Sequence, residues 1–310
     1  MISRPLALGA ALAAITSVVL VAAPEQQVFR GGTDVVQLNV TVANGAGHFV
    51  SGLTRDDFQV FEDGVPQDVS LFSAERQPIA LSILLDSSTS MDTKIAVAQE
   101  AAVGFVKRLA EKDVAEVIEF NSHERLIQPF TRDKTSLEAA IRKTAAGGST
   151  ALYNAIYVAL RDLAHNQPTQ QGSELLRQAI VVLSDGEDTT SLKTYDDVLD
   201  ETKRAEAVIY AIGLRSKEDA GPRHGFSEGD FVMRSFAQET GGWAFFVDDL
   251  TQLSSVYVKI ADELANQYVI GYTSKNHKHD GTWRKVAVRV SKPDMNARTR
   301  TGYFAPAVDR

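Results

Sequence analysis

The chain has 310 residues, of which 44% are hydrophobic and 23% charged, so its length fits about two domains of ordinary globular composition. This composition excludes a fully disordered chain, a collagen-like chain and a membrane protein with several spans. The formal net charge of −8 argues against a nucleic-acid-binding protein, whose affinity depends on neutralising phosphates. The chain has no cysteine, which removes disulfides, cysteine-ligated zinc and thiol nucleophiles.

The first 23 residues predict a signal peptide. Arg4 supplies the positive start, residues 6–23 are small and apolar, and Val21-Ala22-Ala23 fits a cleavage site. The alternative is an uncleaved anchor, which is the one way in which this sequence would contact a membrane. Either reading predicts an exported protein that is periplasmic, attached to the cell envelope or secreted. An exported chain without cysteine is typical of bacteria.

Residues 24–76 predict a small β segment. Apolar residues alternate from Val36 to Val42, and turn signals stand at 44–45 and 63–64. The segment is too short to bury much of a core by itself. It therefore needs another part of the chain to pack against.

Residues 77–262 predict a doubly wound α/β domain with a mostly parallel sheet. Three runs, 79–85, 179–183 and 208–212, are almost continuously apolar, as in strands that are covered on both faces. Helical stripes lie between and after these runs. Such alternation of strands and helices is typical of the α/β class. The run 124–130 is expected as an antiparallel edge strand beside 114–120.

Residues 263–310 return to a β pattern, with strands expected at 268–272 and 284–290. We expect this C-terminal segment to pack with the N-terminal one, so that the two flanks form a small β-sandwich-like unit. The alternative is that the last strands extend the α/β sheet.

Polar side chains follow the first apolar run of the α/β domain. Asp86, Ser88 and Ser90 come directly after it, and in a doubly wound sheet ligands bind at the carboxyl ends of the strands. Three oxygen-bearing side chains at every second position of a turn can converge on one hard cation.

Two further segments bring oxygen atoms to the same edge. Asp185 follows the second long apolar run, and Thr150 follows a pair of glycines at 147–148 that allows close approach of the backbone. Ser149 is the alternative hydroxyl in this loop. Glu187 and Asp188 are expected as solvated loop acids, with metal ligation as the alternative.

The order Asp-x-Ser-x-Ser at 86–90, Gly-Gly-Ser-Thr at 147–150 and Ser-Asp-Gly at 184–186 resembles the von Willebrand factor type A (VWA) domain. The resemblance covers residues 77–262 and implies a Rossmann-like fold. The flanking motifs at 52–64 and 302–306 resemble a family of exported bacterial proteins that are related to this domain.

The resemblance implies a metal-ion-dependent adhesion site. Its hydroxyls would ligate Mg²⁺ directly and its aspartates largely through water, with Mn²⁺ or Ca²⁺ as substitutes. An open position on the ion would accept a Glu or Asp of a protein partner. The implied metal residues are Asp86, Ser88, Ser90, Thr150 and Asp185. The residues expected to form the partner-binding rim are Ser87, Thr89, Met91, Ser149, Tyr153 and Glu187.

No catalytic residue is predicted. The sequence lacks both the Gly-x-Ser-x-Gly motif of serine hydrolases and the Gly-x-x-x-x-Gly-Lys-Ser/Thr phosphate loop. The leading hypothesis is an exported protein-binding module for adhesion or scaffolding. One alternative is a structural scaffold of the cell envelope in which the metal only stabilises the loops. A weaker one is a metal-dependent hydrolase that uses Asp86. The sequence does not fix the oligomeric state.

Overall fold

The computed structural model describes residues 35–165, 176–215 and 227–307. The predicted signal segment lies outside these ranges, as do the polar residues 166–175 and 216–226. The helices are α1 (Ile95–Arg108), α2 (Lys134–Ile141), α3 (Leu152–His165), α4 (Tyr195–Arg204), α5 (Glu228–Thr240) and α6 (Leu253–Ala265). None of the helices in the described ranges is both long and apolar enough to cross a bilayer.

Fourteen strands and three short 3₁₀ helices complete the described elements. The strands are β1 (Val35–Asn44), β2 (Phe58–Glu62), β3 (Val65–Gln67), β4 (Val69–Ser73), β5 (Ile79–Asp86), β6 (Val114–Phe120), β7 (Glu124–Thr131), β8 (Arg177–Ser184), β9 (Val208–Leu214), β10 (Ala244–Val247), β11 (Tyr268–Thr273), β12 (Trp283–Val290), β13 (Met295–Arg298) and β14 (Gly302–Phe304). The 3₁₀ helices are η1 (Arg55–Asp57), η2 (Thr89–Met91) and η3 (Leu250–Gln252).

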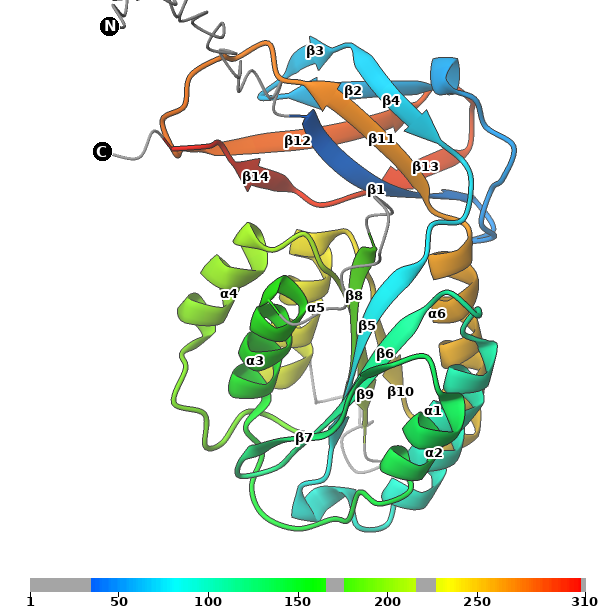
Figure 1. Cartoon of the computed structure of the whole chain (residues 1–310), viewed down its shortest axis with the longest axis vertical. Coiled ribbons are helices and arrows are strands. Elements are labelled where there is room, and N and C mark those ends of the chain that lie inside the picture. Colours follow the sequence, from blue (N-terminus) through cyan, green and yellow to red (C-terminus); the bar gives the residue numbers. More distant parts are fainter. Residues whose placement is uncertain (1–34, 166–175, 216–226, 308–310) are drawn as a thin grey trace, which may run out of the picture. The chain divides into compact units, whose positions relative to one another are not determined.

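A six-stranded sheet in the order β10-β9-β8-β5-β6-β7 forms the centre of the α/β part (Figure 1). Its strands are parallel except β7, which pairs with β6 in the antiparallel sense at one edge. The predicted α/β class and the edge strand are therefore confirmed. β5 lies between β8 and β6, and every one of its residues is buried.

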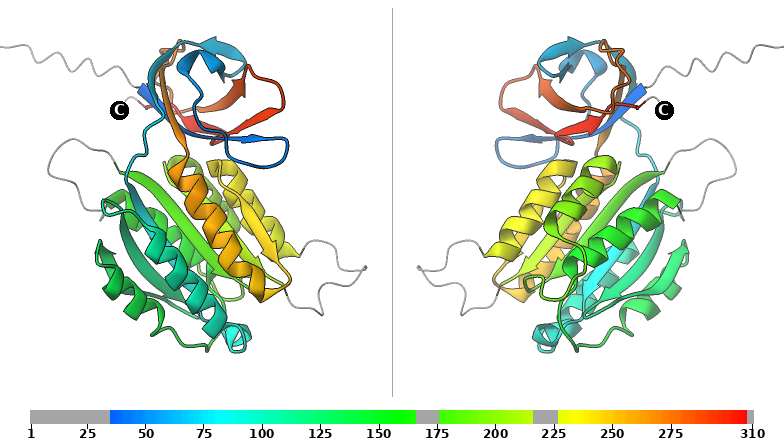
Figure 2. Two further views of the ribbon diagram at one scale, coloured as in Figure 1. Left: turned by 90° about the vertical axis from the view of Figure 1, so that its right-hand side faces the viewer. Right: turned by 90° about the vertical axis from the view of Figure 1, so that its left-hand side faces the viewer.

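Alternate residues of β5 face two different helix layers. Leu81 and Ile83 pack in one apolar cluster with α1, α2 and α6, and Ala80 and Leu84 pack in the other with α3, α4 and α5. Figures 1 and 2 show these two helix layers on opposite faces of the sheet. Cover on both faces explains why the strand is apolar along its whole length.

The two flanking β segments share two four-stranded sheets, β13-β1-β11-β4 and β14-β12-β2-β3. In the first sheet, strands from the N-terminal side alternate with strands from the C-terminal side, and β1 pairs with β11 in the antiparallel sense. In the second sheet, the C-terminal pair β14-β12 joins the N-terminal pair β2-β3 through β12 and β2. Their inward residues form one apolar cluster, which includes Leu38, Val60, Ile270 and Val286. In the described ranges, the strands after β10 pair within these two sheets rather than with the central one.

Buried polar groups join the β sheets to the α/β part. Glu263 of α6 is 2% exposed, and it accepts hydrogen bonds from Thr41 Oγ1 (3.0 Å) and Tyr210 OH (2.9 Å). Arg298 Nη2 donates to the same carboxylate oxygen. A buried carboxylate needs several donors to offset its lost hydration. This network therefore fixes β1 and β13 against α6 and β9.

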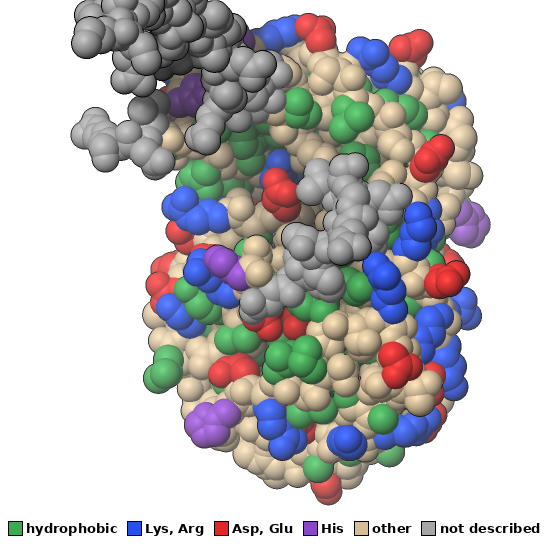
Figure 3. All heavy atoms as spheres, in the orientation of Figure 1, with side chains coloured by type: hydrophobic (Ala, Val, Ile, Leu, Met, Phe, Trp, Pro, Cys, Tyr) green, Lys and Arg blue, Asp and Glu red, His purple; other side chains and the backbone are tan. Residues whose placement is uncertain are grey.

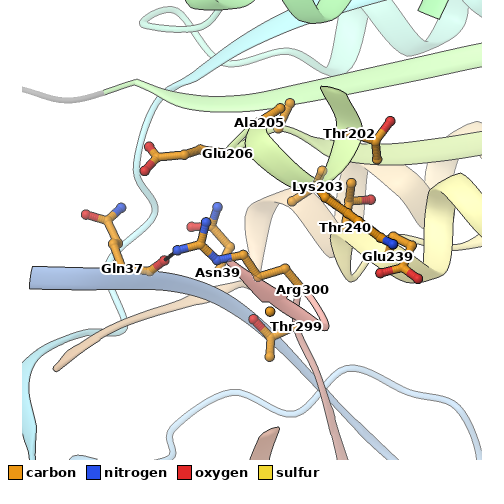
Figure 4. Close-up of a pocket in the computed structure, with 13 residues that line it drawn as sticks. Gln37, Asn39, Thr202, Lys203, Ala205, Glu206, Glu239, Thr240, Thr299 and Arg300 are labelled. Carbon is orange, nitrogen blue, oxygen red and sulfur yellow. Dashed lines mark hydrogen bonds between the residues drawn. The ribbon is translucent and has the colours of Figure 1, made fainter. Parts of the chain in front are cut away.

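A narrow crevice of about 30 Å³ lies between β1 and the ends of α4 and α5. Figure 4 shows Arg300 reaching into it, where Nη2 donates to the carbonyl oxygen of Gln37 at 2.9 Å. Within the described residues, Asn39 Oδ1, Thr202 Oγ1 and Arg300 Nε line it without a hydrogen-bond partner. Its size and polar lining suit ordered water rather than an organic ligand.

Glu116 on β6 makes the stability of this fold depend on pH. It is 1% exposed, and Ser82 Oγ donates to its Oε1. Burial first and the neighbouring Asp162 carboxyl second raise the pKa of Glu116, against the lowering effect of the Ser82 hydrogen bond, to about 8. An unfolded chain would release this proton near pH 4.3. Folding stability is therefore complete below about pH 4.3 and falls as the pH rises towards 8.

We expect Glu116→Gln, which keeps the size of the side chain without a titrating group, to remove the fall in folding stability towards pH 8. Between pH 5 and pH 8 the free energy of unfolding of the wild type should fall by about 3 kcal/mol relative to the variant, because each pKa unit is worth about 1.4 kcal/mol. Urea unfolding at several pH values measures the difference, with exposed Glu111→Gln as the control. Parallel pH profiles for wild type and Glu116→Gln would contradict this assignment.

Candidate metal centre

The centre begins where β5 ends, at Asp86. The Asp86 side chain is fully buried, and its Oδ1 accepts a hydrogen bond from the backbone N–H of Ser88 at 2.7 Å. Its Oδ2 accepts one from Ser184 Oγ at 2.5 Å, at the end of the neighbouring strand β8. Burial raises the pKa of Asp86, the two hydrogen bonds lower it, and the nearby Asp185 charge raises it. This carboxylate is held in a fixed place but lacks a full counter-charge.

The two serines connect this loop to β8. Ser88 Oγ lies 3.0 Å from Ser90 Oγ, which donates to Asp185 Oδ1 at 2.7 Å. The other oxygen of Asp185 contacts Nζ of Lys94. The Asp185 side chain is 0% exposed and that of Lys94 is 18% exposed. The structure thus brings Ser88, Ser90 and Asp185 into direct contact beside Asp86.

The glycine loop is fixed to the Asp86 loop by its backbone. The N–H of Gly147 donates to the carbonyl of Ser87 at 2.7 Å, and the N–H of Thr89 donates to the carbonyl of Gly148 at 3.0 Å. Gly148 has φ +84°, and a Cβ there would lie 2.7 Å from Ser122 Oγ. A side chain at Gly148 would therefore strain the backbone and push this loop away.

Thr150 reaches the same edge at the end of this loop. It is 5% exposed, and its carbonyl accepts the N–H of Thr189 at 2.9 Å. Its Oγ1 lies 3.8 Å from the position that a Cβ on Gly186 would take, directly after Asp185. Ser149 is exposed, so of the two hydroxyl residues Thr150 is the one enclosed beside the strand end.

The five candidate metal residues supply only oxygen atoms, from two carboxylates and three hydroxyls. Within the described ranges, no three side chains of the His, Cys, Asp and Glu types form a group that could hold a metal. Hydroxyls would therefore have to complete any cation site at this edge. Oxygen donors of this kind suit hard cations such as Mg²⁺ and Ca²⁺. The residues present fit Mg²⁺ in their chemistry.

Four of the predicted rim residues are accessible. Thr89, Ser149 and Glu187 are exposed, and Tyr153 is half-buried. Burial raises the pKa of Tyr153, and the charge of Asp188 raises it further. Thr89, Ser149 and Glu187 lie in the segments that carry the candidate metal residues, and Tyr153 lies in the first turn of α3, directly after one of them.

The prediction that Ser87 and Met91 belong to this rim is wrong. Both are fully buried. Ser87 Oγ donates inward to the carbonyl of Phe120 at 3.3 Å, and Met91 packs in the apolar cluster beneath α1. A turn that closes on the core sends some of its side chains inward, which the sequence spacing does not reveal.

The two acids after Asp185 stabilise the loops around them. Asp188 Oδ2 accepts the N–H of Tyr153 at 2.9 Å in the first turn of α3. Glu187 Oε1 accepts the N–H of Glu228 at 3.1 Å where α5 begins. Carboxylates are favourable at helix N-termini because free N–H groups and the helix dipole meet there. Asp188, which also accepts from the Ser191 N–H at 3.1 Å, is thus not the solvated acid that we expected.

Sequence reasoning missed three residues of this region. Lys94 contacts Asp185. The sequence could have indicated this residue, because the helix dipole disfavours a positive charge at the start of a helix. Leu192 in the loop after β8 is 92% exposed, and Phe231 in the first turn of α5 is 61% exposed. The Phe231 ring centroid lies 6.3 Å from that of Tyr195. Exposed apolar side chains indicate an interaction surface only where they form a contiguous patch, so Leu192 and Phe231 are candidates for partner contact rather than evidence of it.

Acidic and basic side chains are interspersed on the face drawn in Figure 3. Ion pairs account for part of this mixing, such as Arg204 with Asp200 (3.0 Å) on α4 and Arg161 of α3 with Glu201 of α4 (3.5 Å). Opposite charges at short range cancel each other's field.

Residues 81–259, more than half of the chain, match the family model of the von Willebrand factor type A domain. The chain belongs to this family. All five candidate metal residues lie within the matched range. A solved VWA structure from Catenulispora acidiphila shares the fold, with a TM-score of 0.51 at 12% identity, over 90% of this chain and 76% of that one.

Related sequences come from bacteria. An uncharacterized protein of Borreliella burgdorferi is 25% identical over 223 residues, which make up 69% of this chain and 62% of the Borreliella protein. A UPF0353 protein of Mycobacterium ulcerans is 24% identical over 261 residues, which cover 79% of this chain and 77% of that protein. The chain thus spans less than two thirds of the length of the Borreliella relative.

The glycine pair offers a matched test of how the VWA loop is positioned. We expect Gly148→Ala to lower the free energy of unfolding by about 1–2 kcal/mol, because the residue has positive φ and meets Ser122. Gly147→Ala is the control, since a Cβ there meets nothing within 4 Å. Urea unfolding of both variants measures the difference, and equal stability of the two would show that the close approach at Gly148 is relaxed in solution.

Proposed function

We propose that this VWA protein is an exported protein-binding module. In this proposal Asp86, Ser88, Ser90, Thr150 and Asp185 hold a divalent cation, with Mg²⁺ as the first candidate and Mn²⁺ or Ca²⁺ as substitutes. The observation that carries it is the hydrogen-bonded cluster of Ser88, Ser90 and the buried carboxylates of Asp86 and Asp185 at one edge of the sheet, with the enclosed Thr150 beside Gly186. When bound, Mg²⁺ supplies a position that a Glu or Asp side chain of a protein partner can occupy.

The protein groups around this edge are arranged to receive a partner. Ser90 and Thr89 are exposed beside the buried Asp86, so the centre opens on the surface rather than into the core. Exposed hydroxyls and a half-buried tyrosine, Tyr153, form the polar part of the surrounding surface. Polar rims with aromatic side chains are typical of protein interfaces.

An apolar part of the same surface supports a protein partner over a small solute. Leu192 and Phe231 are 92% and 61% exposed, and backbone hydrogen bonds fix the loop that carries Leu192 and the first turn of α5 that carries Phe231. The Leu192 N–H donates to Asn154 Oδ1 at 3.0 Å, and the Phe231 N–H donates to the Ser227 carbonyl at 3.1 Å. Side chains that are held in the open lose little entropy on docking.

Export remains part of the proposal. It is supported by the apolar segment after Arg4 and by the absence of cysteine, both read from the sequence. In the proposal the chain acts at the periplasmic side of the envelope or outside the cell. The binding activity and the protein partner belong to the same proposal as export.

The test is metal-dependent capture. The full chain is immobilised and exposed to an envelope extract of its source bacterium, with Mg²⁺ or with EDTA. We expect a partner that is retained with Mg²⁺, released by EDTA, and lost when the Glu or Asp that it presents is changed to the amide. Ser90→Ala should lose at least about 90% of this capture, since even the loss of a group that only supports a metal ligand typically costs about 10–100-fold.

Thr93→Ala is the matched control, because this exposed hydroxyl lies three residues further along the same loop. Leu192→Ala should weaken capture without changing Mg²⁺ binding. Leu71→Ala, which changes an exposed leucine of β4, should leave both capture and Mg²⁺ binding unchanged. Capture that survives EDTA and depends on Leu71 would favour the envelope scaffold. Turnover of a phosphate or peptide substrate that needs Mg²⁺ and Asp86 would favour the hydrolase.

A further inference from the structure

A lysine ammonium group occupies one side of the candidate metal centre. Nζ of Lys94 contacts Oδ2 of Asp185, while Oδ1 of the same carboxylate accepts the Ser90 hydroxyl at 2.7 Å. The Asp185 side chain is 0% exposed, so its charge is removed from water. Both of its oxygen atoms are therefore engaged, one by a proposed metal ligand and the other by a cation of the chain itself.

The position of Lys94 in the fold gives no benefit to the helix that it begins. Lys94 is the N-cap residue of α1 and makes no capping hydrogen bond with its side chain. Helix N-termini favour Ser, Thr, Asp or Asn at this position and disfavour positive charge. The attraction that holds the ammonium there is consequently that of the Asp185 carboxylate.

We propose that Lys94 is a built-in counter-cation of the metal centre, which neutralises Asp185 in the metal-free protein and leaves it when a divalent cation binds. This inference rests on the proposed function and adds a regulatory residue to the same site. Two cations that share one buried carboxylate repel each other strongly. Lys94 is 18% exposed on a flexible four-carbon chain, so its ammonium has a short path to water.

Binding of the ion is in this proposal an exchange of charges. The ammonium that leaves Asp185 regains its hydration, and the aspartate turns from a partner of Lys94 into a partner of the metal. The exchange has two consequences of opposite sign. Lys94 stabilises the metal-free fold, because an unpaired buried carboxylate is strongly unfavourable. It also lowers the affinity for the metal, because the ion has to displace it.

Lys94→Met separates these two effects. With Mg²⁺ alone as the probe, we expect the full-length variant to bind it about tenfold more tightly than the wild type, since a partly buried ion pair no longer competes. The metal-free variant should melt at a lower temperature than the metal-free wild type. Saturating Mg²⁺ should remove this difference, because the ion then neutralises Asp185 in both proteins. Calorimetry measures the Mg²⁺ affinity, and thermal unfolding at constant ionic strength measures the melting temperatures without and with Mg²⁺.

Two controls accompany this test. Lys94→Arg keeps the positive charge and should bind Mg²⁺ nearly as the wild type does. Lys107→Met removes a lysine from the same helix, where Nζ lies 3.7 Å from Glu138 in an exposed pair, and should change neither affinity nor melting. Lys94→Gln is the second neutral variant, for use if Lys94→Met does not fold.

The outcomes separate this inference from the proposed function. Tighter binding by Lys94→Met, or binding by that variant alone, supports the exchange. Equal or weaker binding by the folded neutral variants overturns it and leaves the metal site intact. Failure of both the wild type and the neutral variants to bind Mg²⁺ or Mn²⁺ overturns the proposed function, and the exchange with it.

Discussion

Two carboxylates buried side by side require a positive charge beside them, and this requirement explains most of what surrounds the candidate metal centre. Asp86 and Asp185 stand at the ends of neighbouring parallel strands, and the side chains of both are fully enclosed. Hydrogen bonds from Ser184, Ser90 and the Ser88 backbone offset part of the lost hydration. They do not remove the negative charge, which is left to Lys94 or to a metal ion.

The fold supplies the rest of this arrangement. Parallel strands covered by helices on both faces bring their carboxyl ends to one edge, so segments distant in the sequence meet there. The two four-stranded sheets are connected to the α/β part at the start of β5. This strand begins at Ile79 and ends at Asp86, at the candidate metal centre. The buried network around Glu263 holds those sheets at that opposite end. The loops of the candidate metal centre thus lie at the end of β5 that is away from these sheets.

Much of this could be predicted from the sequence. Continuous apolar runs indicated the parallel strands, because this pattern is local, and the order of Asp, Ser and Thr residues indicated which side chains would lie near one edge of the sheet. Metal binding by these side chains stays a prediction. Ser87 and Met91 were misplaced because the direction of a side chain in a closing turn depends on tertiary packing. Asp188 and Lys94 were missed as partners for the same reason, since the groups that they contact, Tyr153 and Asp185, lie far away in sequence. Spacing alone does not encode such pairings.

Titration of the full chain with Mg²⁺ by calorimetry, with Asp86→Asn as the comparison, tests the central claim most directly. The claim predicts saturable binding at one site in the wild type and at least about tenfold weaker binding in the variant, because the amide removes one of two charges that attract the ion. Circular dichroism verifies that the variant is folded. Equal binding by the two proteins, or no binding of Mg²⁺ or Mn²⁺ by either the wild type or Lys94→Met, would contradict it.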